Sequence, residues 1–308
     1  MKAARWLDRV RDLRRWAGIG LVGCVLMVAA VLVADTAGTG AFVARAQEQT
    51  LPAAEVILEK SIEATGGRAA YERTHSRKST GKMEMPAMGL KAEAVEYSAV
   101  PDLSYMILES PEIGKIESGS GGDIYWEMTQ MTGPRVKEGD ERALARRSTF
   151  NADLRWREFF PDVSTAGIDT VDGRPCYKLV LIPTEGPVET RYYDAGTYLL
   201  AKQEMLVETP MGEVPIEFFP SDYREVGGLL MPFKIRQVLM KMQEMVFATD
   251  SVWFNVEIPE SLFVFPEPIK ALLAKQAAPA PEAPAEGEAA PAAAPQAPEA
   301  EKAPVETE

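Results

Sequence analysis

The chain has 308 residues and a formal net charge of −13 at pH 7, with 46 acidic against 33 basic side chains. An acidic protein is poorly suited to bind nucleic acid or an anionic membrane surface, because both repel negative charge. We therefore expect no nucleic-acid partner.

The first 46 residues have the pattern of an export signal. A basic segment (1–16) precedes an apolar run (17–34), and Ala44-Arg45-Ala46 provides an A-x-A cleavage site. We predict cleavage after Ala46 and export to the periplasm. The alternative is an uncleaved inner-membrane anchor through 17–34, because this run just reaches the length that spans a bilayer.

The exported part is expected to begin with two helices. Pro52 lies near the start of the first, where a missing N–H has little cost, and Gly66-Gly67 ends it as a glycine cap. A short helical turn follows over 68–74. The buried stripe of the first helix is predicted to consist of Val56, Ile57, Leu58 and Ile62.

From Ser76 the hydrophobic period changes to two, which is typical of half-buried antiparallel strands. The first hairpin is predicted over 76–100, with its turn at 86–89. Further strands are expected over 105–108, 115–117 and 123–128, with a turn at 119–122 between the last two.

Two short helices are predicted in the middle of the chain. The first, over 138–147, is strongly charged, and the second, over 151–160, carries large apolar side chains. A strand over 177–182 follows them.

Two hairpins then indicate a meandering antiparallel sheet. The strands 189–193 and 198–205 flank a turn at 194–197, and two glycines in the segment 224–228 permit the turn before 229–235. Pro232 predicts an edge or a bulge at its position. Two final strands are expected within 237–255, and Pro266 closes the domain.

These hairpins carry a family resemblance. The run RYYDAGTYLLAKQE, followed by SDYREVGGLLMPFKI, resembles the LolA-like superfamily of outer-membrane lipoprotein carriers and lipoprotein-sorting-like proteins, in particular its uncharacterised branch. The likeness runs from about Glu55 to Pro266. It implies a mainly β (α+β) fold, in which a strongly curved antiparallel half-barrel is closed on its concave face by helices. It also implies an apolar cavity for acyl chains.

Signs of catalysis are missing from the sequence. His75 is the single histidine, so a zinc site or a Ser-His-Asp arrangement would depend on it almost alone. The chain has no Walker A loop, no H-E-x-x-H and no G-x-S-x-G motif. We therefore predict a protein that is not an enzyme and has no catalytic, metal or cofactor site.

Methionine and aromatic residues supply the candidate ligand site. Flexible, polarizable thioethers suit surfaces that adapt to varied apolar ligands, although they also serve as ordinary core filling. Strand alternation and the implied helical lid suggest these cavity or lid residues: Met83, Met85, Met106, Trp126, Met128, Trp156, Phe159, Met205, Met240 and Met242.

The sequence thus predicts three parts: the signal or anchor at 1–46, a β half-barrel domain at 51–270, and a disordered acidic tail rich in Ala, Pro and Glu at 276–308. The favoured function is a periplasmic carrier that binds a lipid or a lipidated protein. The alternative is an extracytoplasmic sensory or protein-interaction domain of envelope signalling, tethered to the membrane where the N-terminal segment stays uncleaved, whose partner is an envelope membrane protein.

Overall fold

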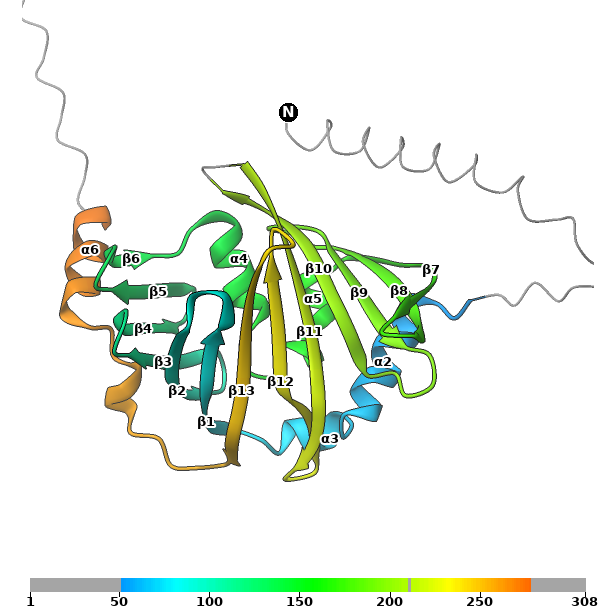
Figure 1. Cartoon of the computed structure of the whole chain (residues 1–308). Helices are drawn as coiled ribbons and strands as arrows, with labels where there is room; N and C mark the ends of the chain where they lie inside the picture. Colours follow the sequence, from blue (N-terminus) through cyan, green and yellow to red (C-terminus); the bar gives the residue numbers. More distant parts are fainter. Residues whose placement is uncertain (1–50, 210–211, 278–308) are drawn as a thin grey trace, which may run out of the picture. The chain divides into compact units, whose positions relative to one another are not determined.

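The computed structural model describes residues 51–209 and 212–277 (Figure 1). The predicted signal or anchor at 1–46 and nearly all of the predicted tail at 276–308 lie outside these residues. Within the described ranges, no helix has both the length and the apolar character needed to cross a bilayer.

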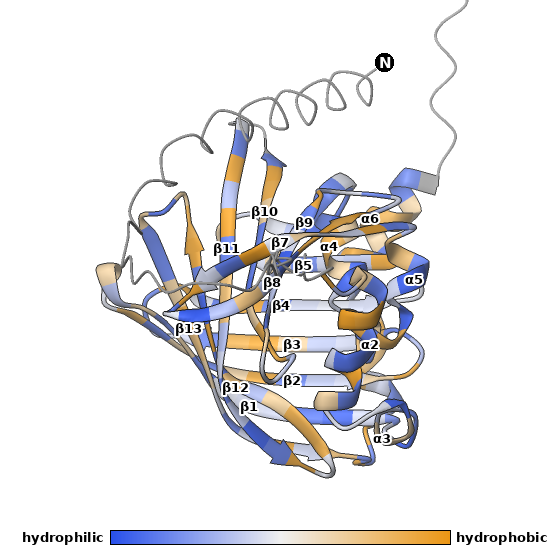
Figure 2. Ribbon diagram, turned by 90° about the vertical axis from the view of Figure 1, so that its right-hand side faces the viewer, coloured by the Kyte–Doolittle hydropathy of each residue, from blue (hydrophilic) through white to orange (hydrophobic). Residues whose placement is uncertain are grey.

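The described chain is built on one open sheet of 13 strands in the order β6-β5-β4-β3-β2-β1-β13-β12-β11-β10-β9-β8-β7. Every neighbouring pair is antiparallel, and the sheet curves strongly around the helices on one side (Figure 2). This confirms the predicted fold class. The first meander consists of β1 (Ser76–Met85), β2 (Leu90–Ala99), β3 (Leu103–Ser110), β4 (Gly114–Gly121), β5 (Ile124–Thr129) and β6 (Gly133–Val136).

The second meander returns across the other half of the sheet, and its last strand pairs with β1. Pro232 lies where β12 pairs with β11 only, because the ladder to β13 begins at Lys234. The missing N–H of Pro232 therefore costs no ladder bond on that side. The strands are β7 (Asp162–Val171), β8 (Arg174–Ile182), β9 (Glu189–Asp194), β10 (Leu200–Thr209), β11 (Gly212–Val226), β12 (Leu229–Leu239) and β13 (Gln243–Phe254).

Four elements were not predicted from the sequence: the short helix η3 (Glu260–Phe263) and the three described next. The two edge strands β6 and β7 lack a clear apolar alternation, and Pro134 interrupts β6, which an edge position tolerates. The final helix, α6 (Glu267–Ala277), runs beyond the predicted boundary at 270. The end of its sequence resembles the Ala- and Pro-rich tail that follows, so the sequence alone does not mark it as a helix. The side chain of Ile269 is fully buried and attaches α6 to the rest of the domain.

Two strand boundaries also differ from prediction. β4 continues through Gly121, so the expected turn at 119–122 is reduced to its last residue and Asp123. β12 continues through Leu239 without the break expected after Ile235. In β4, pairing on both sides extends the strand into a Gly-Ser-Gly sequence of weak strand propensity. In β12, pairing with β11 and β13 on both sides continues to Leu239.

The helices lie mainly on one side of the sheet, which we call the inner face (Figures 1 and 2). Because β6 and β7 are the opposite edges of the sheet, the connection between them has to cross that face. We call this connection, residues 138–160, the crossing segment. The helical elements are α2 (Ala54–Ala64), α3 (Arg68–Glu72), η1 (Pro86–Met88), α4 (Gly139–Arg147), η2 (Ala152–Arg155), α5 (Trp156–Phe159), η3 (Glu260–Phe263) and α6.

The main core forms where α2 and the end of the crossing segment pack on β8 and β9. Ile57 of α2 is fully buried there, with Leu179 and Leu181 of β8 beneath it. The sequence placed Val56 in the buried stripe, but its side chain is 45% exposed. At 100° per residue, Val56 lies about 180° from the centre of the face defined by Ile57, Leu58 and Ile62, so it is on the exposed side of the helix.

Ile57→Ala is expected to destabilise the protein by about 2–5 kcal/mol, because it removes a buried side chain and leaves a cavity. Val56→Ala, one residue away on the same helix, is expected to change stability by less than about 0.5 kcal/mol. Urea denaturation of both variants measures the difference. Equal losses would show that α2 does not dock on the sheet through Ile57.

Candidate functional site

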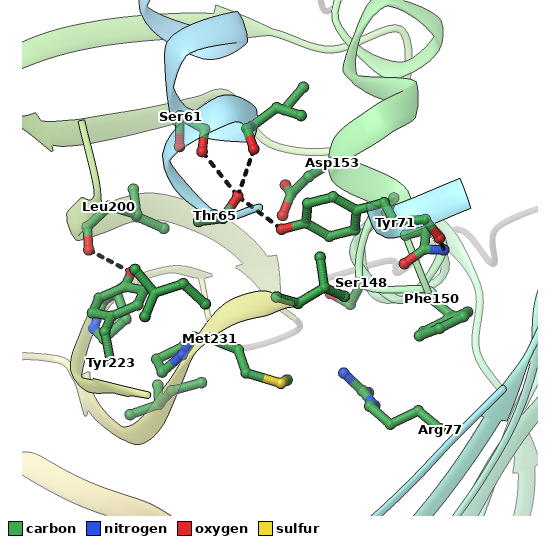
Figure 3. Close-up of a pocket in the computed structure, with 18 of the residues that line it drawn as sticks. Ser61, Thr65, Tyr71, Arg77, Ser148, Phe150, Asp153, Leu200, Tyr223 and Met231 are labelled. Atoms are coloured by element: carbon green, nitrogen blue, oxygen red, sulfur yellow. Dashed lines mark hydrogen bonds between the residues drawn. The ribbon is translucent and has the colours of Figure 1, made fainter. Parts of the chain in front are cut away.

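A cavity of about 530 Å³ lies between the inner face, α2 and the crossing segment (Figure 3). Its volume falls within the range of small-molecule binding sites, about 300–1,000 Å³. Leu58 and Ile62 of α2 and Trp156 of α5 contribute apolar wall on the helical side. On the sheet side the apolar wall is formed by Leu200, Leu229, Met231, Ile235, Val252 and Phe254.

Several polar groups in the cavity wall are already satisfied by neighbouring protein atoms. Tyr71 donates its hydroxyl to Thr65 Oγ1 at 2.9 Å, and Thr65 donates to Ser61 O at 2.9 Å (Figure 3). On the opposite side, Tyr223 donates to Leu200 O at 2.8 Å. These bonds fix the wall and leave its rings and methyl groups facing the cavity.

The sheet side also carries a charged pair. Arg77 and Ser79 are two residues apart on β1, so they share the inner face, and Ser79 is opposite Glu96 in β2. Arg77 Nη2 donates to Glu96 Oε1 at 2.6 Å, and Ser79 Oγ donates to Glu96 Oε2 at 3.3 Å. All three residues line the cavity.

Further along the same strands the inner face becomes apolar. Met83 of β1 packs with Leu90 and Ala92 of β2 and with Leu108 of β3 in a separate buried cluster. Met85, Met106, Ile116 and Phe247 pack against it. The inner face of the first meander therefore changes from a polar end at Arg77 to an apolar end at Met83, about 20 Å away along the strand.

The crossing segment is fixed to the sheet by a buried charge cluster. Glu189 of β9 is 1% exposed and accepts hydrogen bonds from Arg147 Nε at 2.8 Å, Arg191 Nη2 at 2.7 Å and Gln203 Nε2 at 2.9 Å. Arg147 also donates to the carbonyl oxygens of Glu185 and Pro187. The cluster therefore joins the end of α4 to β9, to β10 and to the loop between β8 and β9.

A second polar cluster ties the helices to one another. Glu59 of α2 accepts hydrogen bonds from Arg68 Nη2 at 2.9 Å, Trp156 Nε1 at 3.1 Å and Arg157 Nη1 at 2.6 Å. Burial alone raises the pKa of Glu59, but the hydrogen bonds from Arg68, Arg157 and Trp156 outweigh it and lower the pKa from 4.5 to about 2. Glu59 is therefore ionised throughout the neutral range.

The structure places six of the ten predicted site residues on the inner face or in the helices that cover it. Trp156 lines the cavity itself, and Phe159 belongs to the main core beside it. Met205 is opposite Glu189 in the β9–β10 ladder and is buried. The remaining members of this group belong to the apolar end of the inner face: Met83, Met85 and Met106.

The other four lie elsewhere. On β5, Glu127 pairs with Arg135, which also pairs with Glu141 of α4, so Glu127 points to the inner face. Trp126 and Met128 alternate with it and therefore point to the outer face. Met240 and Met242 form part of the β12–β13 turn and are 45% and 80% exposed.

Sequence reasoning missed the polar residues of the site. Arg77, Glu96, Glu59 and Glu189 belong to a chain with many charged side chains, and no motif distinguishes them. Glu189 alone carries a weak signal, since it begins the RYYD-containing strand next to a second charged residue, Arg191. Because neighbouring residues of a strand face opposite sides of the sheet, Tyr125 and Trp126 cannot both face the cavity. The sequence does not reveal the register with β4 that decides which of them does.

The described residues contain no group of three or more His, Cys, Asp or Glu side chains arranged to hold a metal ion. The cavity wall is instead a mixture of apolar side chains, satisfied hydroxyls and paired charges. Such a wall is chemically suited to holding an amphipathic molecule by burial and hydrogen bonding.

Glu189→Gln is expected to destabilise the protein by about 3–5 kcal/mol, because it leaves two buried guanidinium groups without their shared counter-charge. The control is Glu185→Gln, which breaks the exposed pair with Arg142 and is expected to cost less than about 1 kcal/mol. Chemical denaturation measures both. A loss below 1 kcal/mol for Glu189→Gln would contradict a structural role for the cluster.

Glu59→Gln tests the pH dependence of helix docking. Since the folded-state pKa of Glu59 lies below the unfolded value, its contribution to stability is complete above about pH 4.5 and is lost as pH falls toward 2. The variant should be less stable than the parent at pH 7, and the gap should narrow between pH 4.5 and 2.

Urea unfolding at pH 7, 4.5 and 3 measures the difference in the free energy of unfolding between Glu59→Gln and the parent protein. Glu63→Gln, an exposed position on the same helix, is the control and should change stability by less than about 0.5 kcal/mol at pH 7. A gap that keeps the same size at all three pH values would disprove the linkage.

Comparison with known proteins identifies the fold. No family model and no curated protein matches the sequence. Among solved structures, a LolA superfamily protein from Nitrosomonas europaea is similar over 70% of this chain and 99% of its own, with 13% identity and a TM-score of 0.50.

Two further structures have TM-scores just below that value. A DUF1329 family protein from Desulfovibrio piger covers 68% of this chain and 96% of its own at 14% identity, with a TM-score of 0.49. A putative outer membrane lipoprotein-sorting protein domain from Vibrio parahaemolyticus has the same coverage at 13% identity, with a TM-score of 0.48. The N. europaea structure carries the conclusion: this chain has the LolA-like fold that its hairpin motifs predict.

Proposed function

We propose that the protein is a periplasmic carrier that binds a lipid, or the lipid part of a lipidated protein, on the inner face of its sheet. The observation that carries this proposal is the cavity of about 530 Å³, whose apolar wall comes from α2, the crossing segment and three strands of the second meander, β10, β12 and β13. The LolA-like fold supports it, and so does the apolar end of the inner face around Met83.

Burial of an acyl chain supplies the binding energy. Each buried methylene group contributes about 0.8 kcal/mol, so about a dozen such groups contribute roughly 10 kcal/mol. This exceeds the lower estimates of the cost of association, about 4 kcal/mol. The methionines Met83, Met85 and Met106 suit this task, since unbranched thioethers adapt to chains of different length and branching.

Entry and release require the crossing segment to move. Near the protein surface, the crossing segment is held by ion pairs between partly exposed side chains, such as Arg142 with Glu185 and Arg155 with Asp102. Pairs of this kind contribute little each, so they can break and re-form at low cost. The buried pair of Arg147 with Glu189 holds the end of α4, and the main core holds α5, so the parts of the crossing segment outside these two anchors are the ones that shift.

Native mass spectrometry on the full chain, exported in a bacterial host and purified without detergent, tests the proposal. A co-purifying mass that extracts into organic solvent is expected. The mass also separates the two sources of an acyl chain, a free lipid or a lipidated polypeptide. A protein that stays free of ligand after incubation with envelope lipids would instead favour the sensory or protein-interaction alternative.

Val252→Trp gives a site-specific version of this test. Val252 lines the cavity from β13, where it is opposite Ser79 of the inner face, so an indole there fills the binding space. We expect the affinity for a fluorescent fatty-acid analogue to fall more than tenfold. The matched control is Ser251→Trp, which places the same ring on the other face of the strand and should keep the parent affinity.

Equal affinities for Val252→Trp, Ser251→Trp and the parent protein would show that the analogue binds outside this cavity. Thermal unfolding of both variants confirms that they are folded before their affinities are compared.

A further inference from the structure

The inner face contains one place where hydrogen-bonding groups are buried and unused. Among the buried side-chain nitrogen and oxygen atoms of residues 51–209 and 212–277, only Arg77 Nε and Ser98 Oγ have no hydrogen-bond partner. Arg77 and Ser98 are directly opposite each other in the β1–β2 ladder, so both point to the inner face. An unpaired buried polar atom is destabilising, because it has lost its hydrogen bonds to water without replacing them, and here two such atoms coincide.

We propose that this place holds the head of the bound lipid, and that the head is an uncharged acyl ester whose carbonyl oxygen accepts a hydrogen bond from Arg77 Nε. This inference rests on the proposed function, since it assigns the polar end of the same ligand. Arg77 lines the cavity, and its guanidinium group points into it (Figure 3).

The head is uncharged because Arg77 already has a counter-charge. Glu96 accepts from Arg77 Nη2 at 2.6 Å and is held in place by Ser79. A carboxylate or phosphate at Arg77 Nε would therefore approach Glu96 closely and be repelled by it. A carbonyl oxygen accepts the same hydrogen bond without that repulsion.

The other cations of the cavity wall are also committed. Arg147 uses Nε for Glu189 and its two terminal nitrogens for the carbonyl oxygens of Glu185 and Pro187. Arg191 donates Nε and Nη2 to Glu189, and its remaining Nη1 lies 3.7 Å from Asp153. Neither arginine offers a free charge that would favour an anionic head elsewhere in the cavity.

The position of Arg77 also gives the chain a direction. From Arg77 the inner face of β1 continues through Ser79 and Gly81 to Met83, a distance of about 20 Å. An acyl chain with its ester at Arg77 would leave the cavity along β1 toward Met83, Leu90 and Leu108, and its far end would have to enter the cluster in which these side chains now pack on one another. Head and tail are thus matched to the polar and apolar ends of one surface.

The test uses the full chain and three probes that share a twelve-carbon chain: 1-monolauroylglycerol, laurate and dodecyltrimethylammonium, each below its micelle concentration. Titration calorimetry measures the three affinities. In the parent protein the ester is expected to bind tightest, by about tenfold over the ammonium probe, which cannot accept a hydrogen bond. Tighter binding of laurate than of the ester in the parent protein would overturn the inference.

Two variants locate the contact. Glu96→Gln leaves Arg77 without its counter-charge, so laurate should gain about tenfold relative to the ester. The double variant Arg77→Met with Glu96→Gln removes the donor and keeps the site neutral, so the ester should lose about tenfold while the ammonium probe is unchanged. Thermal unfolding establishes that both variants are folded.

The outcomes separate this inference from the proposed function. If the three probes keep their parent affinity ratios in both variants, the chain binds but its head does not contact Arg77. If no probe binds the parent protein, the carrier function itself fails, and the assignment of the head fails with it.

Discussion

The pairing of β1 with β13 is the constraint on which the rest of the structure depends. It joins two antiparallel meanders into one sheet and leaves β6 and β7 as opposite edges. The chain between those edges has to cross the sheet, and a curved sheet presents its concave face for the shorter path. The crossing segment and the cavity beneath it therefore follow from the strand order, before any side chain of the site is considered.

Charged side chains then decide how the helices are held. Apolar packing is concentrated where α2 and α5 meet β8, while the end of α4 is attached through Arg147 and Glu189. A buried ion pair is directional, whereas hydrophobic contact is not. The cluster fixes the position of α4 over the sheet without filling the space beside it, so a cavity remains where an apolar contact would have closed it.

The inner face is graded from polar to apolar along its strands. The residues of β1 that face inward change from Arg77 and Ser79 to Met83 and Met85, and those of β2 change from Ser98 and Glu96 to Ala92 and Leu90. A surface that changes from polar to apolar matches an amphipathic molecule better than a uniformly apolar surface does. It also explains why the proposed carrier function and the proposed ester contact concern one ligand in one orientation.

The sequence by itself determined the antiparallel sheet, the opening helices, the central hairpins and the family resemblance, because these are encoded in local periodicity, turn residues and short motifs. Only the tertiary structure decided which residues share the inner face. Trp126 and Met128 point outward since Glu127 between them faces α4, and Met240 and Met242 fall in a turn because β12 extends through Leu239. Arg77 and Ser98 carry no local signal and Glu189 carries only a weak one, since their roles arise from strand register and from contacts between residues far apart in the chain.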